Sequence, residues 1–297
     1  MAALSARGVT AAQFDVSLLE SVPYRLTSGG LMLGTDEAAS CIPTASCVRG
    51  WLRRLAPPEW RRDVAPSSHE GVVRASWVAL LIGIADGCGI EWLSDVGGLF
   101  TAENKIVQHA AATALGISVP ASAIVSSRDR IPASLGDEFI AKPLGPGQFE
   151  DGGGEPRVVF TRLLSRGSPE LEALAGAPFL LQQYVAAERH LRVVTVRERF
   201  WIAALDASDL PVDWRRNHAA HDAFVPSQEH GEVGQLALRI ARKLRVGYSS
   251  QDWVISRNGE SVFLDLNPGG QWLFLPEPVR TEVTEAIAAW LAGEESP

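Results

Sequence analysis

The chain has 297 residues, of which 46% are hydrophobic and 21% charged, and its formal net charge is −8. This composition excludes disordered and collagen-like chains and allows a sizeable core with two or three subdomains. The negative charge argues against nucleic acid as a partner, because nucleic-acid binders need a basic surface to displace counterions from the phosphate backbone.

Cysteine content and hydropathy bear on the compartment of the protein. The three cysteines are odd in number and unevenly spaced, which fits neither a disulfide framework nor a zinc site. The longest apolar run, around 76–85, is shorter than the roughly 18 to 20 residues that a membrane span needs. No basic segment followed by an apolar segment opens the sequence, as a signal peptide would require. We therefore expect a soluble, cytoplasmic protein with no membrane partner.

The N-terminal third is predicted to combine short strands with two helices. Residues 1–60 alternate short extended segments with breakers, such as Ser-Gly-Gly at 28–30. A largely apolar face predicts a helix over 72–87. A second helix is predicted over 101–115.

The ends of this second helix carry capping residues. Thr101 is the expected N-cap, and Gly116 stands where a C-terminal glycine would end the helix. The following Ile-Ser-Val-Pro marks an abrupt change to extended chain. We place the first subdomain boundary near Gly98.

The middle of the chain turns to short strands. Runs of β-branched, aromatic or alternating apolar residues predict strands over 123–126, 138–143, 158–163 and 179–185. A glycine-rich stretch, 144–156, separates the second from the third. It is compatible with a long hairpin connection and with a phosphate-covering flap that offers backbone N–H groups without side-chain obstruction. The sequence leaves both interpretations open.

The C-terminal third mixes hairpins with helices. Its patterns predict helices over 231–245 and 282–292 and strands over 191–196, 200–205, 250–256 and 261–267. Asn258-Gly259 is typical of a type I′ turn, so the last two strands should pair as a hairpin. The mixed order of helices and antiparallel hairpins predicts an α/β or α+β fold.

Three oxygen-bearing side chains are expected to converge on this last hairpin. Asp265 and Asn267 are two residues apart, so both leave the same face of their strand. Pairing through the turn can bring Asp252 to that face. Two carboxylates and an amide oxygen suit Mg²⁺ held jointly with nucleotide phosphates. A polar strand end exposed to water is the alternative interpretation.

Basic residues occupy unusual positions elsewhere in the pattern. Lys142 interrupts an apolar strand, where an unpaired ammonium would be costly, and Arg192 does the same in another. Lys105 lies in the first turn of a helix, where the helix dipole disfavours a cation unless an anion compensates it. Arg215 follows in a loop. Each is compatible with an ordinary surface charge, but together they describe a cationic wall opposite an acidic one.

These motifs occur in an order that resembles the ATP-grasp superfamily, which includes glutathione synthetase and D-alanine–D-alanine ligase. The features are Lys105, Lys142, Gln-Gln-Tyr-Val at 182–185, Leu-Arg-Val at 191–193, Asp252 and Asp-Leu-Asn-Pro at 265–268.

Two further motifs narrow the resemblance. Val-Asp-Trp-Arg at 212–215 and Phe-Leu-Asp-Leu-Asn-Pro-Gly-Gly-Gln-Trp at 263–272 are similar to the ATP-grasp peptide maturases of the microviridin or graspetide group. Those enzymes install ester or amide links between side chains of a ribosomally made precursor peptide. The resemblance covers roughly residues 50–276.

The resemblance implies a role for each matching position. Lys105 and Lys142 would contact the phosphates of ATP, and Arg192 and Arg215 would stabilise the acyl phosphate and the transferring phosphoryl group. The Mg²⁺ ligands would be Asp252, Asp265 and Asn267. The adenine edge would be read by the backbone of Gln182, Gln183, Tyr184 and Val185, with Glu188 near the ribose.

An ATP-grasp fold implies three subdomains. We expect an N-terminal pre-ATP-grasp subdomain over 1–98, a central subdomain over 99–185 and a C-terminal subdomain over 186–297. Residues 1–15 begin after the first strand and most of the first helix of the resembled group, so two interpretations stay open: a truncated first subdomain, or a misassigned start of the sequence. The partners implied are a leader-bearing precursor peptide and a second copy of the chain in a homodimer.

The implied activity is an ATP- and Mg²⁺-dependent ligase. It would activate a carboxylate as an acyl phosphate and join it to a hydroxyl or an amine, macrocyclising a precursor peptide. Two alternatives stay open: a ligase for free amino acids or short peptides, and a degenerate, non-catalytic binding protein. Gln183, His190 and Asp265 motivate the last alternative, since each departs from the residue common in the family.

Overall fold

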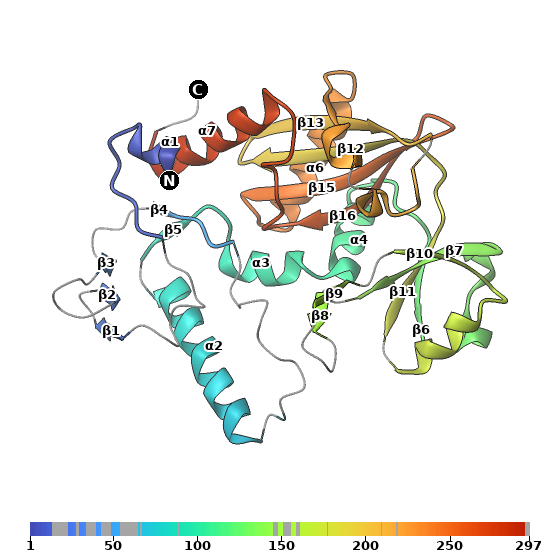
Figure 1. The fold of residues 1–297 in the computed structure, drawn as a ribbon, viewed down its shortest axis with the longest axis horizontal. Coiled ribbons are helices and arrows are strands. Elements are labelled where there is room, and N and C mark those ends of the chain that lie inside the picture. The colour runs from blue at the N-terminus through green and yellow to red at the C-terminus, as the bar shows by residue number, and fades with distance from the viewer. Residues whose placement is uncertain are drawn as a thin grey trace.

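Two antiparallel sheets, one central and one C-terminal, organise the computed structural model (Figure 1). The structure describes the chain except residues 14–22, 28–29, 34–39, 43–48, 54–64, 66, 88, 145–147, 151–155, 159–160, 177, 209, 218 and 295–297. Nearly all described strand pairs are antiparallel, the exception being the short pair β4–β5. The expected mixture of helices and sheets is therefore confirmed, in its α+β form.

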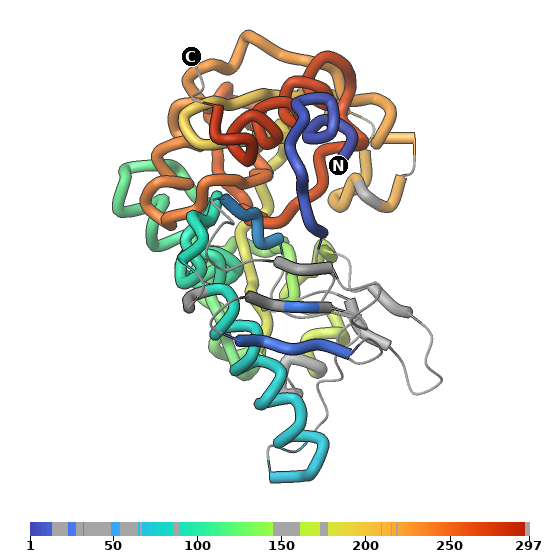
Figure 2. Tube along the Cα trace, turned by 90° about the vertical axis from the view of Figure 1, so that its left-hand side faces the viewer, coloured from blue at the N-terminus to red at the C-terminus, as the bar shows by residue number. Residues whose placement is uncertain are grey.

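The N-terminal part contains small sheets and one long helix. Its elements are α1 (Ala2–Ser5), β1 (Tyr24–Thr27), β2 (Gly30–Leu33), β3 (Ser40–Ile42), β4 (Arg49–Gly50), α2 (His69–Gly87) and β5 (Glu91–Trp92). Strands β1–β3 form one sheet beside α2 (Figure 2). The rings of Tyr24 and Trp77 lie 5.5 Å apart, tilted by 49°. The helix predicted over 72–87 is confirmed and begins three residues earlier.

The single helix expected over 101–115 is two helices, α3 (Val96–Ala102) and α4 (Lys105–Ala114). Thr101 is not an N-cap, because it lies inside α3. Asn104 takes that role instead, and its side-chain oxygen accepts from the N–H groups of Ile106 and Val107. Gly116 follows α4 with a φ of +71°, as a C-terminal glycine should.

The central sheet has the strand order β10-β7-β11-β6, formed by β10 (Arg162–Ser165), β7 (Glu138–Pro143), β11 (Phe179–Gln183) and β6 (Ser122–Val125). Short 3₁₀ segments, η2 (Arg128–Arg130), η3 (Ala133–Leu135) and η4 (Pro169–Gly176), flank it. Phe139, Leu164 and Leu181 lie in its buried core.

The strand predicted over 158–163 is wrong in its bounds. The described structure has two strands there, β9 (Pro156–Val158) and β10. They belong to different sheets, because β9 pairs with β8 (Gln148–Glu150) while β10 pairs with β7. The predicted flap falls on this β8–β9 region, and all of its glycines lie outside the described residues.

The C-terminal sheet has the order β14-β13-β12-β15-β16. Its strands are β12 (Ala187–Val196), β13 (Arg199–Asp206), β14 (Val225–Pro226), β15 (Tyr248–Ser256) and β16 (Ser261–Asn267), with η5 (Trp214–Arg216), α5 (Ala219–Asp222), α6 (Gly231–Lys243) and α7 (Val279–Leu291) around them. Alternation along β12 sends Leu191 and Val193 to one buried core and Val194 and Val196 to another. Helix α6 contributes to the first core and α7 to the second, so both faces of the sheet are covered.

The β15–β16 hairpin forms as expected, but its turn is different. Gly259 has a φ of +79°, whereas Asn258 is not left-handed, so the two-residue type I′ turn is wrong. Ser256 instead accepts from the Gly259 N–H at 2.8 Å and donates its own N–H to the Glu260 carbonyl at 2.9 Å. This three-residue connection fixes the register of the strands that carry the acidic residues.

In the part of the chain that the structure describes, no helix is both long enough and apolar enough to cross a membrane.

Candidate functional site

Three charged residues form a row across neighbouring strands of the C-terminal sheet. Asp252 on β15 lies opposite Arg192 on β12 and opposite Asp265 on β16. Directly opposed residues share one face of an antiparallel sheet, so the register places all three side chains together. Arg192 Nη1 lies 3.3 Å from Asp252 Oδ1.

Asn267 lies on β16 two residues after Asp265, on the same face of the sheet. It pairs with Ser250, two residues before Asp252, and its Oδ1 accepts from the Gly269 N–H at 3.0 Å. The backbone at Gly270 passes close to β15, since a Cβ on Gly270 would lie 2.7 Å from the Cβ of Ser250. The amide oxygen of Asn267 thus organises the turn after β16 and stays on the same strand face as Asp265.

Lys142 is held by a buried amide network on the central sheet. Its Nζ donates to Gln182 Oε1 at 2.9 Å, and Gln182 is fully buried. The other end of that amide donates to Ser122 Oγ at 3.2 Å. Gln182 therefore orients the ammonium of Lys142.

Lys105 is the first residue of α4. Its Nζ lies 3.5 Å from Asp265 Oδ2, so a carboxylate compensates the cation at the positive end of the helix dipole. This ion pair links the cationic residues to the acidic row.

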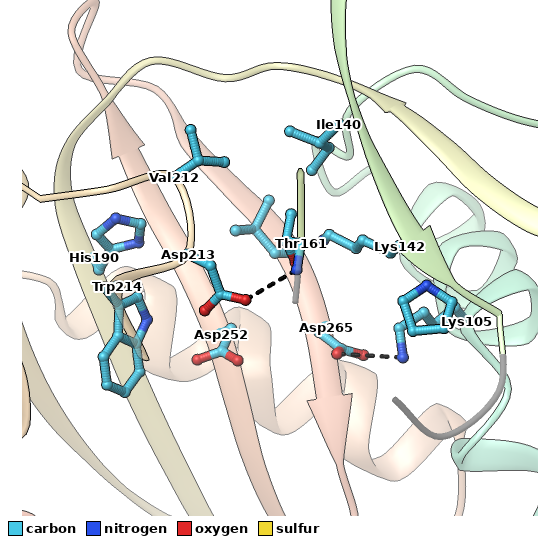
Figure 3. Close-up of a pocket in the computed structure, with 12 residues that line it drawn as sticks. Lys105, Ile140, Lys142, Thr161, His190, Val212, Asp213, Trp214, Asp252 and Asp265 are labelled. Carbon is cyan, nitrogen blue, oxygen red and sulfur yellow. Dashed lines mark hydrogen bonds and ion pairs between the residues drawn. The ribbon is translucent and has the colours of Figure 1, made fainter. Parts of the chain in front are cut away.

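A cavity of about 160 Å³ joins the two groups. The close-up shows lysines at one end, the carboxylates of Asp252 and Asp265 near the middle, and a histidine and a tryptophan at the other end (Figure 3). Its lining residues are Lys105, Ile140, Lys142, Pro143, Thr161, His190, Val212, Asp213, Trp214, Asp252, Leu264 and Asp265.

Several predicted site residues lie outside this lining. Gln183 and Glu188 are exposed, Val185 is half-buried, and Tyr184 is 40% exposed. All four lie around the connection between β11 and β12, next to Gln182. Arg215 belongs to the backbone of η5, but its side chain is outside the described residues.

Arg192 does not line the cavity and packs against aromatic rings. Its Cζ is 5.8 Å from the centre of the Trp214 ring and 5.7 Å from that of Phe274. Its Nε is buried and has no hydrogen-bond partner among the residues that the structure describes. A buried donor of this kind is suited to an anionic ligand.

Asp213 and His190 line the cavity and were not predicted as site residues. Asp213 is only 4% exposed, and its Oδ2 accepts from the Thr161 N–H at 3.0 Å. Burial lowers the pKa of His190, although the charges of Asp252 and Asp213 act in the opposite direction. The only sequence signs were the Val-Asp-Trp-Arg motif and the position of His190 two residues before Arg192.

A second, larger cavity of about 570 Å³ lies elsewhere, between β5 and the β12–β13 turn. Four of its charged residues form ion pairs: Arg242 binds Glu198, and Arg245 Nη2 lies 3.3 Å from Asp95 Oδ1. None of the predicted site residues lines it.

Comparison with solved structures finds proteins with a similar fold. The macrocyclase MdnC from Microcystis aeruginosa MRC, bound with precursor peptide MdnA, superposes with a TM-score of 0.81 at 19% identity, covering 99% of this chain and 94% of that chain. A RiPP-associated ATP-grasp ligase from Chryseobacterium gregarium, in complex with ADP and a leader and core peptide, gives 0.83 at 18% identity, covering 99% and 92%.

The chain has the ATP-grasp fold.

A third solved structure agrees, the ATP-grasp ligase PsnB complexed with minimal precursor, Mg and ADP, with a TM-score of 0.69 at 17% identity and coverage of 98% and 92%. Comparison with protein-family models gives no match, and comparison with curated proteins gives none. Within this ATP-grasp fold the cavity is shared by both main sheets, the central one contributing Lys142 and the C-terminal one Asp252.

Proposed function

We propose that this chain is an ATP- and Mg²⁺-dependent ligase that activates a carboxylate as an acyl phosphate and joins it to a hydroxyl or an amine of a ribosomally made precursor peptide. One observation carries the proposal: Lys142 and Lys105 share a single cavity with Asp252 and Asp265. The ATP-grasp fold supports it, as do the ADP, Mg and precursor peptides named for structures that share this fold.

The donor set fits Mg²⁺ held jointly with phosphates. Asp252 and Asp265 lie directly opposite each other, and Asn267 follows on the same face. No cluster of three or more acidic, histidine or cysteine side chains suited to a metal occurs among the described residues. Mg²⁺ commonly uses one or two carboxylates plus phosphate oxygens rather than a cage made by protein alone. When bound, it would neutralise phosphate charge during transfer.

The remaining residues would orient and neutralise the reacting groups. Phosphoryl transfer needs in-line positioning and charge stabilisation more than a covalent nucleophile. Lys142, aimed by Gln182, and Lys105 would hold the phosphates of ATP. Arg192, whose buried Nε has no hydrogen-bond partner among the described residues, would bind the carboxylate that becomes the acyl phosphate, and Arg215 would act beside it.

The adenine and ribose would lie along the connection after β11. In this proposal the backbone of Gln182, Gln183, Tyr184 and Val185 reads the adenine edge, and Glu188 contacts the ribose. The exposure of Tyr184 and Glu188 supports an open binding edge there. The subdomain division at 98 and 185 is proposed with it, since the second boundary falls between β11 and β12.

The test uses the full chain with ATP, Mg²⁺ and the precursor peptide encoded beside its gene. The expected result is ADP release together with loss of one or more waters from the peptide, read by mass spectrometry. An unchanged peptide mass with intact enzyme would contradict the proposal. ADP release that depends on free amino acids would favour a small-substrate ligase, and no turnover at all would favour a non-catalytic binding protein.

A homodimer and a cytoplasmic location remain part of the proposal. Size-exclusion chromatography with light scattering measures the molar mass in solution. The mass of a single chain at micromolar protein concentration would contradict the homodimer.

A further inference from the structure

The outer edge of β16 is bonded by one glutamine of helix α4. Strand β16 is the last strand of the C-terminal sheet, so β15 is its one partner among the described strands. Leu266 lies on it between the proposed metal ligands Asp265 and Asn267. The Leu266 N–H donates to Gln108 Oε1 at 2.9 Å, and its carbonyl accepts from Gln108 Nε2 at 2.7 Å. The side-chain amide thus makes the pair of backbone bonds that a further strand would make at this residue.

Both ends of this amide are engaged. Gln108 is 1% exposed, and Nε2 also donates to the Ala102 carbonyl at 2.6 Å. An amide nitrogen carries two N–H donors, and here both meet carbonyl oxygens, while the amide oxygen meets an N–H. The reversed amide would place its oxygen against the two carbonyls, so the partners fix its orientation. An apolar side chain would take these bonds away from three buried backbone groups, which folded proteins rarely tolerate.

Gln108 joins three elements around the site. Ala102 ends α3, Gln108 belongs to α4, and Leu266 belongs to β16. The next residue of α4, His109, reaches the same strand, since its Nε2 lies 3.3 Å from the Leu264 carbonyl oxygen. Helix α4 therefore lies along the edge of β16 that β15 does not occupy (Figure 1). Gln108 is its bond to the segment between the two ligands.

The same contact bears on the carboxylate of Asp265. The Leu266 N–H also lies 3.1 Å from Asp265 Oδ1, so this carboxylate and the Gln108 amide share one donor. Without the glutamine oxygen, the N–H would bond to the carboxylate alone and would compete more strongly with a cation for its lone pairs. Gln108 therefore favours a carboxylate that can turn toward a metal.

The ligands flank the bonded residue, so holding its backbone holds both of them. The Leu266 side chain is buried in the core, and strand alternation sends Asp265 and Asn267 to the opposite face. Mg²⁺ demands near-ideal octahedral geometry with metal–oxygen distances of about 2.0–2.1 Å, so a small shift of the strand weakens binding. Since β16 has a strand partner on one side only, the contacts on its other edge decide how firmly this segment is held.

We propose that Gln108 is a positioning residue of the metal site. By completing the hydrogen bonds of Leu266 from the outer edge of β16, it sets the spacing of Asp265 and Asn267 for a divalent cation. The inference rests on the proposed function, because that function supplies the cation. A neutral, buried side chain that does not line the cavity thereby contributes to its metal affinity.

The test measures cation binding directly, with Mn²⁺ as a paramagnetic probe of the Mg²⁺ site. The full chain is saturated with a non-hydrolysable ATP analogue and titrated with Mn²⁺, and free Mn²⁺ is measured by electron paramagnetic resonance. Gln108→Met keeps the length of the side chain and removes all three hydrogen bonds. We expect the Kd for Mn²⁺ to rise about 10- to 100-fold, as when a group that orients a metal ligand is removed.

Gln251→Met is the matched control. Gln251 is also fully buried in this sheet, and its amide also makes three hydrogen bonds, with Ala237, Ser249 and Trp253. None of these partners lies on β16, so this variant should lose thermal stability as Gln108→Met does and keep the wild-type Kd. An equal rise of Kd in both variants would overturn the inference, because general loosening of the core would then explain both.

A second variant and a second measurement separate positioning from poor folding. Gln108→Asn keeps an amide that is one methylene shorter, and its Kd for Mn²⁺ should rise less than that of Gln108→Met. In ATP turnover, lost positioning raises the half-saturating Mg²⁺ concentration, whereas a smaller folded fraction lowers the rate and leaves half-saturation unchanged. Unchanged Kd and half-saturation in both Gln108 variants would overturn the inference alone. A wild-type protein that binds no Mn²⁺ beside the nucleotide analogue would contradict the proposed function itself.

Discussion

The two walls of the cavity are positioned in different ways. The acidic wall, Asp252 and Asp265, is set by strand register within a sheet that has a buried core on each face. The cationic wall consists of two lysines with long side chains, and each depends on a side-chain partner: Gln182 for Lys142 and Asp265 for Lys105. The backbone therefore fixes the acidic wall, whereas side-chain contacts aim the cationic one.

The largest loss of activity is expected from substitutions in the acidic wall. In Asp252→Asn and in Asp265→Asn, Mg²⁺-dependent ATP turnover should fall roughly 10³-fold or more, because a bound metal contributes several kcal/mol of charge stabilisation. The thermal midpoint should change little, since register and not these side chains holds the sheet. Turnover within tenfold of wild type in both variants would contradict the metal assignment.

Removing a phosphate-binding cation should lower the rate less than removing an acidic-wall carboxylate does. Lys142→Ala is expected to lower kcat on the order of 10²–10³-fold, as for other groups that stabilise transition-state charge. Lys243→Ala is the control, because it removes the one remaining lysine and that residue does not line the cavity. Equal rates in the two variants would remove Lys142 from the site.

The partner that aims Lys142 should have a smaller but measurable effect. Gln182→Met keeps the volume and removes the acceptor of the 2.9 Å hydrogen bond. We expect kcat to fall about tenfold, the lower end of what is lost when a group that orients a functional residue is removed. Combined with Lys142→Ala, the change should add nothing further, because both act through the same ammonium. Additive losses would show that Gln182 acts independently.

The smallest effect concerns stability at low pH. Burial lowers the pKa of His109, and the charges of Lys142 and Lys105 act in the same direction, although the Leu264 carbonyl and the charge of Asp265 oppose them. The unfolded chain then binds more protons than the folded one, so the free energy of unfolding should fall as the pH drops from about 6.5 through the folded pKa. His109→Gln should have a flatter pH dependence than the wild type between pH 7.5 and 5. If the free energy of unfolding had the same slope against pH in wild type and variant, the lowered pKa of His109 would be contradicted.

The acidic wall was more predictable from the sequence than the cationic one, for a physical reason. Strand periodicity and a glycine turn were enough to bring Asp252 opposite Asp265, even though the turn type was wrong and a bulge follows Asp252. The bounds of β7 and β16 also follow from local pattern.

What the sequence could not show depends on contacts between distant segments. Asn104, and not Thr101, is the N-cap of α4, because its side-chain oxygen accepts from two N–H groups. N-cap propensity alone does not separate the two residues. Asp213 enters the cavity because its loop packs against Thr161, 52 positions away along the chain. The local sequence pattern predicts that Gln182 lies in a strand, and only tertiary packing turns its amide toward Lys142.

A structure of the protein with Mg²⁺ and a non-hydrolysable ATP analogue tests the central claim most directly. We expect the triphosphate to lie between the ammonium of Lys142 and the carboxylates of Asp252 and Asp265, with the metal on the carboxylate side. A nucleotide bound elsewhere, or a triphosphate that contacts neither wall, would contradict it.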